Sequence, residues 1–483
     1  MNRREFALGN KIRGHEMGLV GSLFVAAFPG GMILPFYVYL FGAGVVWEAI
    51  GIVVCMTIVW SFASYRLMRY SKRHQSICTI PGYLKHRFCD EKEYLRVISS
   101  CQIVILSIII MSLLIKELGL IMFETFGLDS TITEFWTCNI ISAYICIFGY
   151  KAIVKTAPYK AAYMMAVIIL ISIVILKDVG FLTLIQNMMA IDVTGSVSEY
   201  MNILFHNGRP LVAEDYISLL SMGLLASGMP FLLTAFFSAE NSDKINRGKI
   251  VMIVFLQLFF ASAAVMGGIS RGYLYPHKMT NSLAKYISLF YHKLASEGSL
   301  GKVMGYMLIS LIVLAVLITL EGSLSIAMMI VYDDIIRGGR LIRIKKKNER
   351  LYIVLVTFLI GLSCFIVSEC IEDFSINVIV VFIAALGCSV APAVLLSLIW
   401  KRMTKYGAIA GMIGGMLAVP LLKYAPFFGK MGNKKTLCDI LGINSVVPAM
   451  LASFLIIILV SLITPKPSAQ VQEEFDDVKH RMT

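Results

Sequence analysis

The run AVLITLEGSLSIAMMIVYDDI, from Ala315 to Ile335, places Glu321 inside a segment that is otherwise almost wholly apolar until it reaches Asp333 and Asp334. Thirteen residues lead from Glu321 to Asp334, which corresponds to about 20 Å of α-helix at 1.5 Å per residue. In a helix that crosses a bilayer with an apolar core of about 30 Å, the carboxyl group lies near the midplane. An ionisable group costs roughly 2.5–3.5 kcal/mol there on insertion scales, so a compensating interaction is expected.

The composition of the whole chain indicates a membrane protein. Of the 483 residues, 58% are hydrophobic and 15% are charged, against about 25% charged in a soluble domain. The polar, basic residues 1–16 lead straight into the first apolar segment, which we expect to act as the insertion signal. The longest polar stretch, 187–215, is too short for a folded soluble domain. The sequence therefore predicts an all-α integral membrane protein with a single transmembrane domain, 1–483.

Apolar segments of spanning length recur along the chain, and we predict about twelve transmembrane helices. They lie near 17–41, 45–66, 97–124, 134–150, 160–177, 216–238, 250–274, 303–332, 351–371, 375–400, 406–424 and 446–464. With the N-terminus inside, the inner connections carry 28 Lys and Arg residues and the outer ones 11. The positive-inside rule thus predicts a multi-pass protein of the cell (inner) membrane with both termini in the cytoplasm, including the tail 465–483.

The same charge distribution bears on partners. The net charge of +13 follows from the inner loops, which face anionic lipid, so the lipid bilayer and not nucleic acid is the expected partner. Ten cysteines form no CxxC pair, and all seven histidines fall in predicted loops or tails. The sequence therefore predicts no cofactor and no histidine or cysteine metal site.

Two predicted spans are interrupted by helix-breaking residues. The first contains FPGGMILP (28–35) and the sixth contains SMGLLASGMP (221–230). Proline removes a backbone donor and glycine loosens the helix, so each motif frees backbone groups at membrane depth. One such motif alone is explained by a kink, but two motifs five spans apart favour an inverted repeat. We predict repeat one at about 17–177, repeat two at about 216–400, and two extra helices at 406–464.

In an inverted repeat the two interruptions meet at a midplane site. The backbone there is the expected place for a small-molecule solute. The candidate solute-binding residues are Gly30, Gly31, Gly228, Met229 and Pro230.

Three stretches carry a resemblance to a known family. They are IPGYLKHRFCDEKEYLRVISS (80–100), GMPFLLTAFFSAENSDKINRGK (228–249) and, above all, GCSVAPAVLLSLIWKRMTKYGAIAGMIGGML (387–417). The chain resembles the sodium/solute symporter family from about Gly9 to the tail, and is closest to its sodium/proline branch. The resemblance implies a leucine-transporter-like core of five plus five helices and sodium-driven uptake of a small organic solute. From the resemblance we expect the chain to lack the family's usual extra N-terminal helix.

The resemblance also implies a main sodium site that is altered in this chain. Backbone carbonyls of span 1 correspond to Leu23 and Ala26, and the span 8 ligands correspond to Ala315, Ile318 and Thr319. Ile318 stands where the family has a hydroxyl, so we expect weakened Na⁺ binding. Ser323, on the same small-residue face as Thr319 and Gly322, is a further candidate ligand, although that face equally fits helix packing.

A second departure concerns the buried glutamate. The Thr-Asp-x-x-Gln pattern of span 5 becomes TAPYK here, in which Thr156 remains, Ala157 replaces the aspartate and Lys160 replaces the glutamine. Some family members resemble a design with an additional cation site between that aspartate and a span 8 hydroxyl, which corresponds to Glu321. We hypothesise that Lys160 supplies an ammonium to Glu321 where a cation once lay. The candidate coupling residues are therefore Glu321, Lys160 and Thr156.

Other interpretations of these residues remain open. Lys160 begins span 5 from the cytoplasmic side, where lysines extend to the interface, and Glu321 has Ser325 one turn away as a structural hydrogen-bond partner. Without Lys160 nearby, Glu321 is a titrating acid that couples transport to H⁺.

The predicted function is a secondary active transporter that moves a small organic solute, such as an amino acid or related metabolite, by alternating access. Sodium coupling is what the resemblance implies; the alternatives are a proton-coupled or uncoupled exchanger that uses Glu321, or a non-transporting sensor or scaffold. The chain contains no HExxH motif and no nucleophile elbow, so we do not expect an enzyme.

Overall fold

The computed structural model describes residues 12–74, 76–190, 196–239, 241–277, 280–338, 348–371, 376–425 and 435–480. The elements of the first half are α2 (Gly14–Val25), η1 (Ala26–Ile33), α3 (Leu34–Phe41), η2 (Ala43–Val45), α4 (Val46–Arg73), α5 (Ile80–Arg87), α6 (Tyr94–Phe126), α7 (Ser130–Val179), α8 (Phe181–Ala190), α9 (Val197–Tyr200), β1 (Phe205–His206) and β2 (Arg209–Pro210). Those of the second half are α10 (Ala213–Ser227), α11 (Pro230–Ala235), η3 (Phe236–Ser238), α12 (Ser242–Tyr273), α13 (Leu283–Ser296), α14 (Gly298–Ile330), η4 (Val331–Gly338), α15 (Glu349–Glu369), α16 (Ile376–Ile399), α17 (Lys405–Tyr424), α18 (Leu437–Leu441), α19 (Val446–Ile463) and α20 (Ala469–His480).

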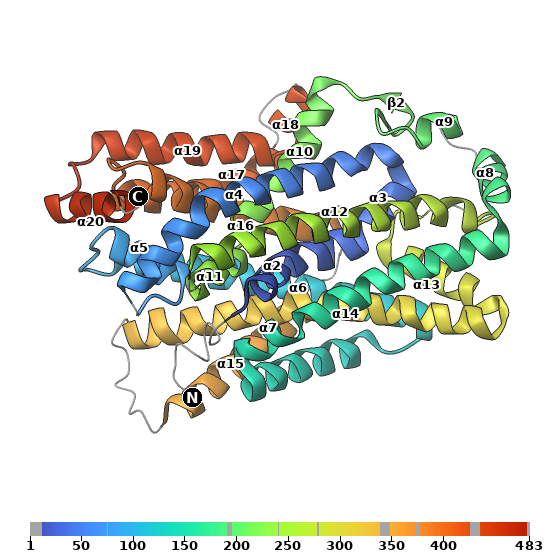
Figure 1. Ribbon diagram of the computed structural model, residues 1–483, viewed down its shortest axis with the longest axis horizontal. Helices are drawn as coiled ribbons and strands as arrows, with labels where there is room; N and C mark the ends of the chain where they lie inside the picture. The colour runs from blue at the N-terminus through green and yellow to red at the C-terminus, as the bar shows by residue number, and fades with distance from the viewer. Residues whose placement is uncertain are drawn as a thin grey trace.

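Within the described ranges, ten helices are long and apolar enough to cross a membrane, and the bent pair α10–α11 raises the number to eleven. The predicted spans 134–150 and 160–177 both lie in the 50-residue α7. Gly149 inside α7 has φ 61° and ψ −169°, a conformation that glycine adopts readily. Figure 1 shows the chain turning back between two arms of α7. Dividing α7 there would give twelve spans, and that number stays a prediction.

The two predicted interruptions are present but differ in form. Residues 26–33 form the π-helix η1, in which Pro29 accepts a hydrogen bond from the Leu34 N–H. The first span therefore keeps a wound backbone through its glycines, as π-helical turns at functional sites do. The second span breaks between α10 and α11, whose axes differ by 47°. We expected two similar interruptions, and only the second is an open break.

The contacts around the broken spans have the exchange symmetry that an inverted repeat requires. Helix α12, the span after the second break, packs along α2 and α3, whereas α4, the span after the first break, packs along α10. Glycines allow both crossings: a Cβ atom at Gly18 would overlap the Gly248 carbonyl, and one at Gly223 would overlap the Gly51 carbonyl. Each broken span is thus held by the second helix of the other repeat. This arrangement confirms the five-plus-five core, while the repeat boundaries stay a prediction.

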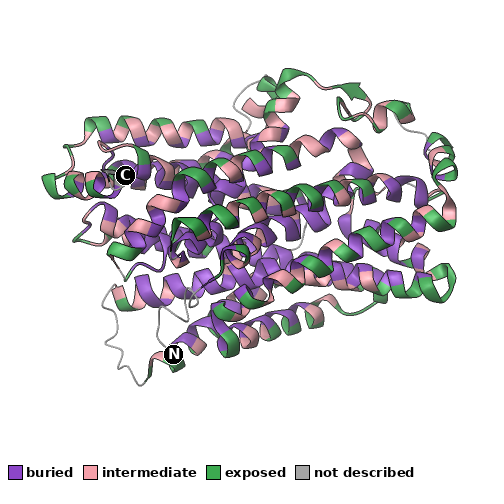
Figure 2. Ribbon diagram, viewed as in Figure 1, coloured by how far each residue is buried: buried purple, intermediate pink, exposed green. Residues whose placement is uncertain are grey.

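The outer helices present apolar side chains away from the bundle. Figure 2 shows buried residues gathered along the central helices and exposed ones on outward surfaces. On α19, Leu451, Leu455, Leu459 and Leu462 recur at helical spacing and are each 57–58% exposed. Because a soluble protein would hide such a stripe, we assign this surface to lipid.

The described parts of both termini lie at one end of the bundle. Helix α20 docks there against the end of α4 through the ion pair Arg73–Asp477 (2.7 Å) and a hydrogen bond between His74 and Glu474 (2.5 Å). At the same end, Gly14 of α2 lies against Lys244 in the first turn of α12. The predicted tail is therefore a packed helix over residues 469–480, whereas residues 1–11 and 481–483 lie outside the described part of the chain. The segment 197–212 covers the opposite end, where Trp47 donates a hydrogen bond to the Ile203 carbonyl at 2.9 Å (Figure 1).

The glycine crossings predict a difference between two alanine substitutions. Gly223→Ala places a methyl group against the α4 backbone, and overpacking of this kind costs about 1–3 kcal/mol. We expect the melting temperature of the purified protein to fall by a few degrees. Gly268→Ala on α12 is the matched control, because a Cβ atom there meets nothing within 4 Å. Equal melting temperatures for the two variants would contradict the close crossing.

Candidate functional site

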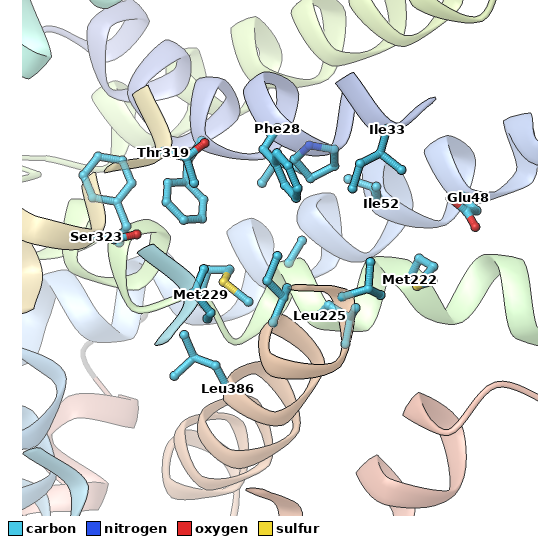
Figure 3. A pocket seen from close by; sticks show the side chains of 18 of the residues that line it. Phe28, Ile33, Glu48, Ile52, Met222, Leu225, Met229, Thr319, Ser323 and Leu386 are labelled. Atoms are coloured by element: carbon cyan, nitrogen blue, oxygen red, sulfur yellow. The ribbon is translucent and has the colours of Figure 1, made fainter. Parts of the chain in front are cut away.

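A cavity lies between the two broken spans, with walls from α4, α6, α14 and α16 completing it. Its volume of about 110 Å³ is several times the roughly 10–15 Å³ that a cavity needs to admit one water molecule. Figure 3 shows Thr319 and Ser323 at one end, Glu48 at the other, and Phe28, Leu225 and Met229 between them. The walls are mostly aliphatic and aromatic, which is typical of a small-molecule site with a few placed polar groups.

Two of the five predicted solute-binding residues line this cavity, namely Met229 and Pro230. The three glycines instead permit close packing behind it. A Cβ atom at Gly30 would press on Phe260, and one at Gly228 would press on the Gly387 backbone. A Cβ atom at Gly31 would lie 3.3 Å from the Met164 side chain. The glycines thus shape the breaks, and the side chains that follow the second break form the wall.

The predicted sodium ligands occupy buried positions where span 8 meets span 1. Leu23, Ala26, Ala315 and Thr319 are each 0–3% exposed, and α14 packs on both α2 and η1. The Thr319 hydroxyl donates to the Ala315 carbonyl at 3.0 Å, which leaves its oxygen lone pairs directed away from that bond. Ser323 lies one turn further and also lines the cavity. Ala315, Thr319 and Ser323 follow one another at four-residue spacing and so lie on one face of α14.

Glu321 belongs to the other side of the same helix. Thr319, Ser323 and Ile326 line the cavity at helical spacing, and Glu321 is offset by about 200° from Thr319 at 100° per residue. The Glu321 carboxylate accordingly faces α7 and does not line the cavity. The carboxylate therefore lies behind the cavity wall, and its role in coupling stays a prediction.

Lys160 and Glu321 form a buried ion pair. The Lys160 Nζ lies 2.6 and 2.7 Å from the two carboxylate oxygens of Glu321, and the side chains are 16% and 5% exposed. The ammonium also lies 5.7 Å from the centroid of the Tyr144 ring, within cation–π range. The interpretation in which Lys160 extends to the interface is therefore wrong, and its ammonium is the partner that Glu321 needs.

The remaining candidates near this pair, Thr156 and Ser325, form no hydrogen bond to either of its residues within the described part of the chain. Thr156, one turn before Lys160, donates its hydroxyl to the Ala152 carbonyl at 2.8 Å. Ser325 is buried and its hydroxyl has no hydrogen-bond partner among the described residues. The alternative in which Ser325 holds Glu321 is consequently not the arrangement that the structure has.

Sequence reasoning missed Glu48, which is the one carboxylate in the cavity lining formed by the described residues. The signal was available, because Glu48 falls in the predicted span 45–66 and intramembrane acids are functional candidates in general. Its position near the start of that span made it resemble an interfacial residue. The structure instead turns it toward the space between the broken spans (Figure 3).

Broken spans that cross between two repeats, a cavity at their meeting point and a lipid-facing surface define the class of secondary membrane transporters. Comparison with known proteins makes the assignment specific. The family model of the sodium:solute symporter family matches residues 18–415, and the chain belongs to this family. It is accordingly a multi-pass membrane protein that carries a small solute by secondary active transport.

Individual relatives are similar over nearly their full lengths. The high-affinity proline transporter PutP of Bacillus subtilis (strain 168) is 25% identical over 459 residues, covering 94% of this chain and 90% of the relative. The sodium/proline symporter of Staphylococcus aureus is 24% identical over 489 residues, covering 99% and 91%.

Two solved structures share the fold. A substrate-bound, outward-open Na⁺-coupled sialic acid symporter aligns with a TM-score of 0.75 at 14% identity, over 96% of this chain and 94% of that one. The nucleobase-cation-symport-1 family transporter MHP1, in a closed conformation with bromovinylhydantoin bound, aligns with a TM-score of 0.57 at 10% identity, over 99% of both chains.

The buried ion pair predicts an unequal effect of removing one charge or both. Lys160→Met leaves a buried carboxylate without a partner, and breaking a buried pair in this way costs about 3–5 kcal/mol. Combining it with Glu321→Gln removes the orphaned charge, so we expect the double variant to melt at a higher temperature than Lys160→Met alone. Lys155→Met, on the exposed side of the same helix, should change the melting temperature little. A double variant that melts below Lys160→Met would contradict the pairing.

Proposed function

We propose that the protein carries a small organic solute across the cell membrane by alternating access, and that the cavity between the broken spans is where the solute binds. The observation that carries this proposal is the lining itself, which takes side chains from η1 of repeat one and from α10 and α11 of repeat two. A rocking of one repeat against the other would open such a cavity to either side in turn.

We further propose that the Lys160–Glu321 pair replaces a bound cation. It joins α7 of repeat one to α14 of repeat two, so movement between the repeats must carry the pair along or break it. The Lys160 ammonium is part of the chain and does not have to dissociate in each transport cycle. A cation bound at the family's additional site, where that site exists, does have to dissociate. The two versions of the hypothesis are a permanent bridge and an acid that exchanges its proton when the bridge opens.

Sodium coupling is what family membership implies, and the residues of this chain point to weak binding. Thr319 can supply a hydroxyl oxygen at the predicted main site, but Ile318 offers only its buried aliphatic side chain. Na⁺ is a hard cation that takes oxygen ligands, so the loss of one of five expected ligands lowers its affinity.

The proposed orientation places both termini in the cytoplasm. The larger positive charge of the predicted inner connections supports it, and so does the packing of α20 and the start of α2 at one end of the bundle. Glu48 then lies toward the outer side. About 37 Å of α4 separates it from Arg73, since 25 residues rise by 1.5 Å each.

Removing the charge of Glu321 tests the coupling role. In proteoliposomes we expect Glu321→Gln to lose gradient-driven accumulation while counterflow exchange of the same labelled solute persists. L-proline and a set of labelled amines and amino acids are the first solutes, each measured with Na⁺ and with H⁺ gradients. Unchanged accumulation by Glu321→Gln would mean that the pair is structural.

The double variant Lys160→Met/Glu321→Gln separates the two versions of the coupling hypothesis. A permanent bridge predicts that removing both charges restores accumulation, whereas a proton-exchanging acid predicts that it stays lost. If the wild-type protein shows no counterflow with any of these solutes, the transport proposal fails and a non-transporting sensor or scaffold takes its place.

The altered sodium site makes a separate prediction about binding. If the dissociation constant exceeds 100 mM, then 100 mM Na⁺ stabilises the protein by less than about 0.4 kcal/mol relative to K⁺. We therefore expect almost no Na⁺-dependent rise in melting temperature for the wild type. Ile318→Ser should introduce such a rise by restoring the hydroxyl, with Ile318→Ala as the control for lost packing. A clear rise in the wild type at millimolar Na⁺ would refute the weakened site.

A further inference from the structure

The charge of the cavity lining carries an inference about the solute. Among the described residues that line it, Glu48 bears the only carboxylate, and there is no lysine, arginine or histidine. The polar groups that remain are the hydroxyls of Tyr37, Ser107, Thr319 and Ser323. The lining thus offers one carboxyl group and no basic side chain.

Glu48 has no partner of its own. Neither a hydrogen bond nor an ion pair to its carboxylate occurs among the residues that the structure describes. Burying an ionised carboxylate without a partner costs free energy. Glu321 on α14 avoids this cost because its carboxylate is paired with Lys160. A cation in the cavity would supply for Glu48 what Lys160 supplies for Glu321.

The surrounding walls also favour a cation with an apolar body. Five aromatic rings line the cavity, from Phe24, Phe28, Tyr37, Phe231 and Phe260, and aromatic faces attract ammonium groups within about 6 Å. The middle of the cavity, between Glu48 and the Thr319 hydroxyl, is formed by Phe28, Leu225 and Met229 (Figure 3). An alkyl or aryl group fits there without leaving polar atoms unpaired.

An anionic group would find no counter-charge in the same space. Helix α11 begins at the cavity with Pro230, which has no backbone N–H, and it is only six residues long. It therefore offers no anion site at its N-terminus. Carboxylate-bearing solutes would have to place their negative charge in apolar surroundings or beside Glu48, where like charges repel.

We propose that the solute is a small organic cation, whose ammonium group pairs with Glu48 and whose apolar body lies among Phe28, Leu225 and Met229. The proposal rests on the proposed function in taking this cavity as the solute site. It assigns Glu48 as the residue that determines specificity for positive charge.

Ligand binding to the purified full-length protein tests the proposal without requiring transport. The probes share one aromatic body and differ in charge: phenethylamine, phenethyl alcohol and 3-phenylpropionate, with L-proline as the zwitterion. Affinity is read from the rise in melting temperature with probe concentration. We expect phenethylamine to bind at least about tenfold more tightly than the other three, because a hydrogen bond to a charged group contributes that much.

Glu48→Gln should remove this preference and leave the alcohol's affinity unchanged. The variant is expected to fold, since it replaces a half-buried carboxyl group without a partner among the described residues by a neutral group of the same shape, and its melting temperature without ligand checks this. Glu117→Gln is the matched control. Glu117 on α6 is 3% exposed and has an unpartnered oxygen, but it does not line the cavity. This control should keep the full preference for the amine.

Two results would overturn the inference: an amine that binds no better than the alcohol, or an amine preference that survives Glu48→Gln. Counterflow distinguishes this failure from that of the proposed function. Exchange of L-proline that does not depend on Glu48 would contradict the cation proposal and support the proposed transport function. Glu48-dependent amine binding without counterflow of any probe would support the cation site and contradict the proposed transport function.

Discussion

The structure depends on one constraint, which is that a chain inside a bilayer must satisfy its backbone polar groups within itself. Two spans of this protein depart from a regular α-helix at membrane depth, as the π-helix η1 and as the open break before Pro230. Both departures pack closely against a neighbouring helix, with Gly30 against Phe260 of α12 and Gly228 against the Gly387 backbone of α16. The cavity exists where these two departures meet, so the solute site follows from the packing of the helices behind it.

Charged side chains inside the bilayer must also find partners within the protein. The two faces of α14 differ in how they satisfy this requirement. On one face Glu321 is neutralised by Lys160 of the other repeat, so the midplane holds no net charge there. On the opposite face the helix presents only the hydroxyls of Thr319 and Ser323 to the cavity. An internal ammonium is always present, whereas a bound ion must be collected from solution. The pair therefore ties the two repeats together independently of the ionic composition on either side.

Much of this architecture can be predicted from the sequence, because span length, helix-breaking residues and a buried acid each have a local physical signature. The partner of Glu321 could not be settled that way, since the distance from Lys160 depends on how α7 packs on α14. The role of the glycines was the least predictable feature. Gly30 and Gly228 mark the breaks correctly, but whether they line a cavity or pack against a neighbouring helix depends on where that helix lies. Glu48 was missed although the rule that identified Glu321 applies to it equally.

The proposed weak sodium site and the proposed preference of the cavity for cations are connected by energetics. Moving one positive charge inward across a membrane potential of 100 mV, negative inside, releases about 2.3 kcal/mol, which by itself supports roughly fifty-fold accumulation at equilibrium. A zwitterion gains nothing from the potential and needs a co-transported ion to be concentrated. A transporter of an organic cation can therefore tolerate Ile318 in place of a sodium ligand, because the solute carries the charge that the ion would otherwise bring. If the proposed cation specificity holds, Glu48 in the lining and Ile318 at the predicted sodium site are two parts of the same change in how transport is driven.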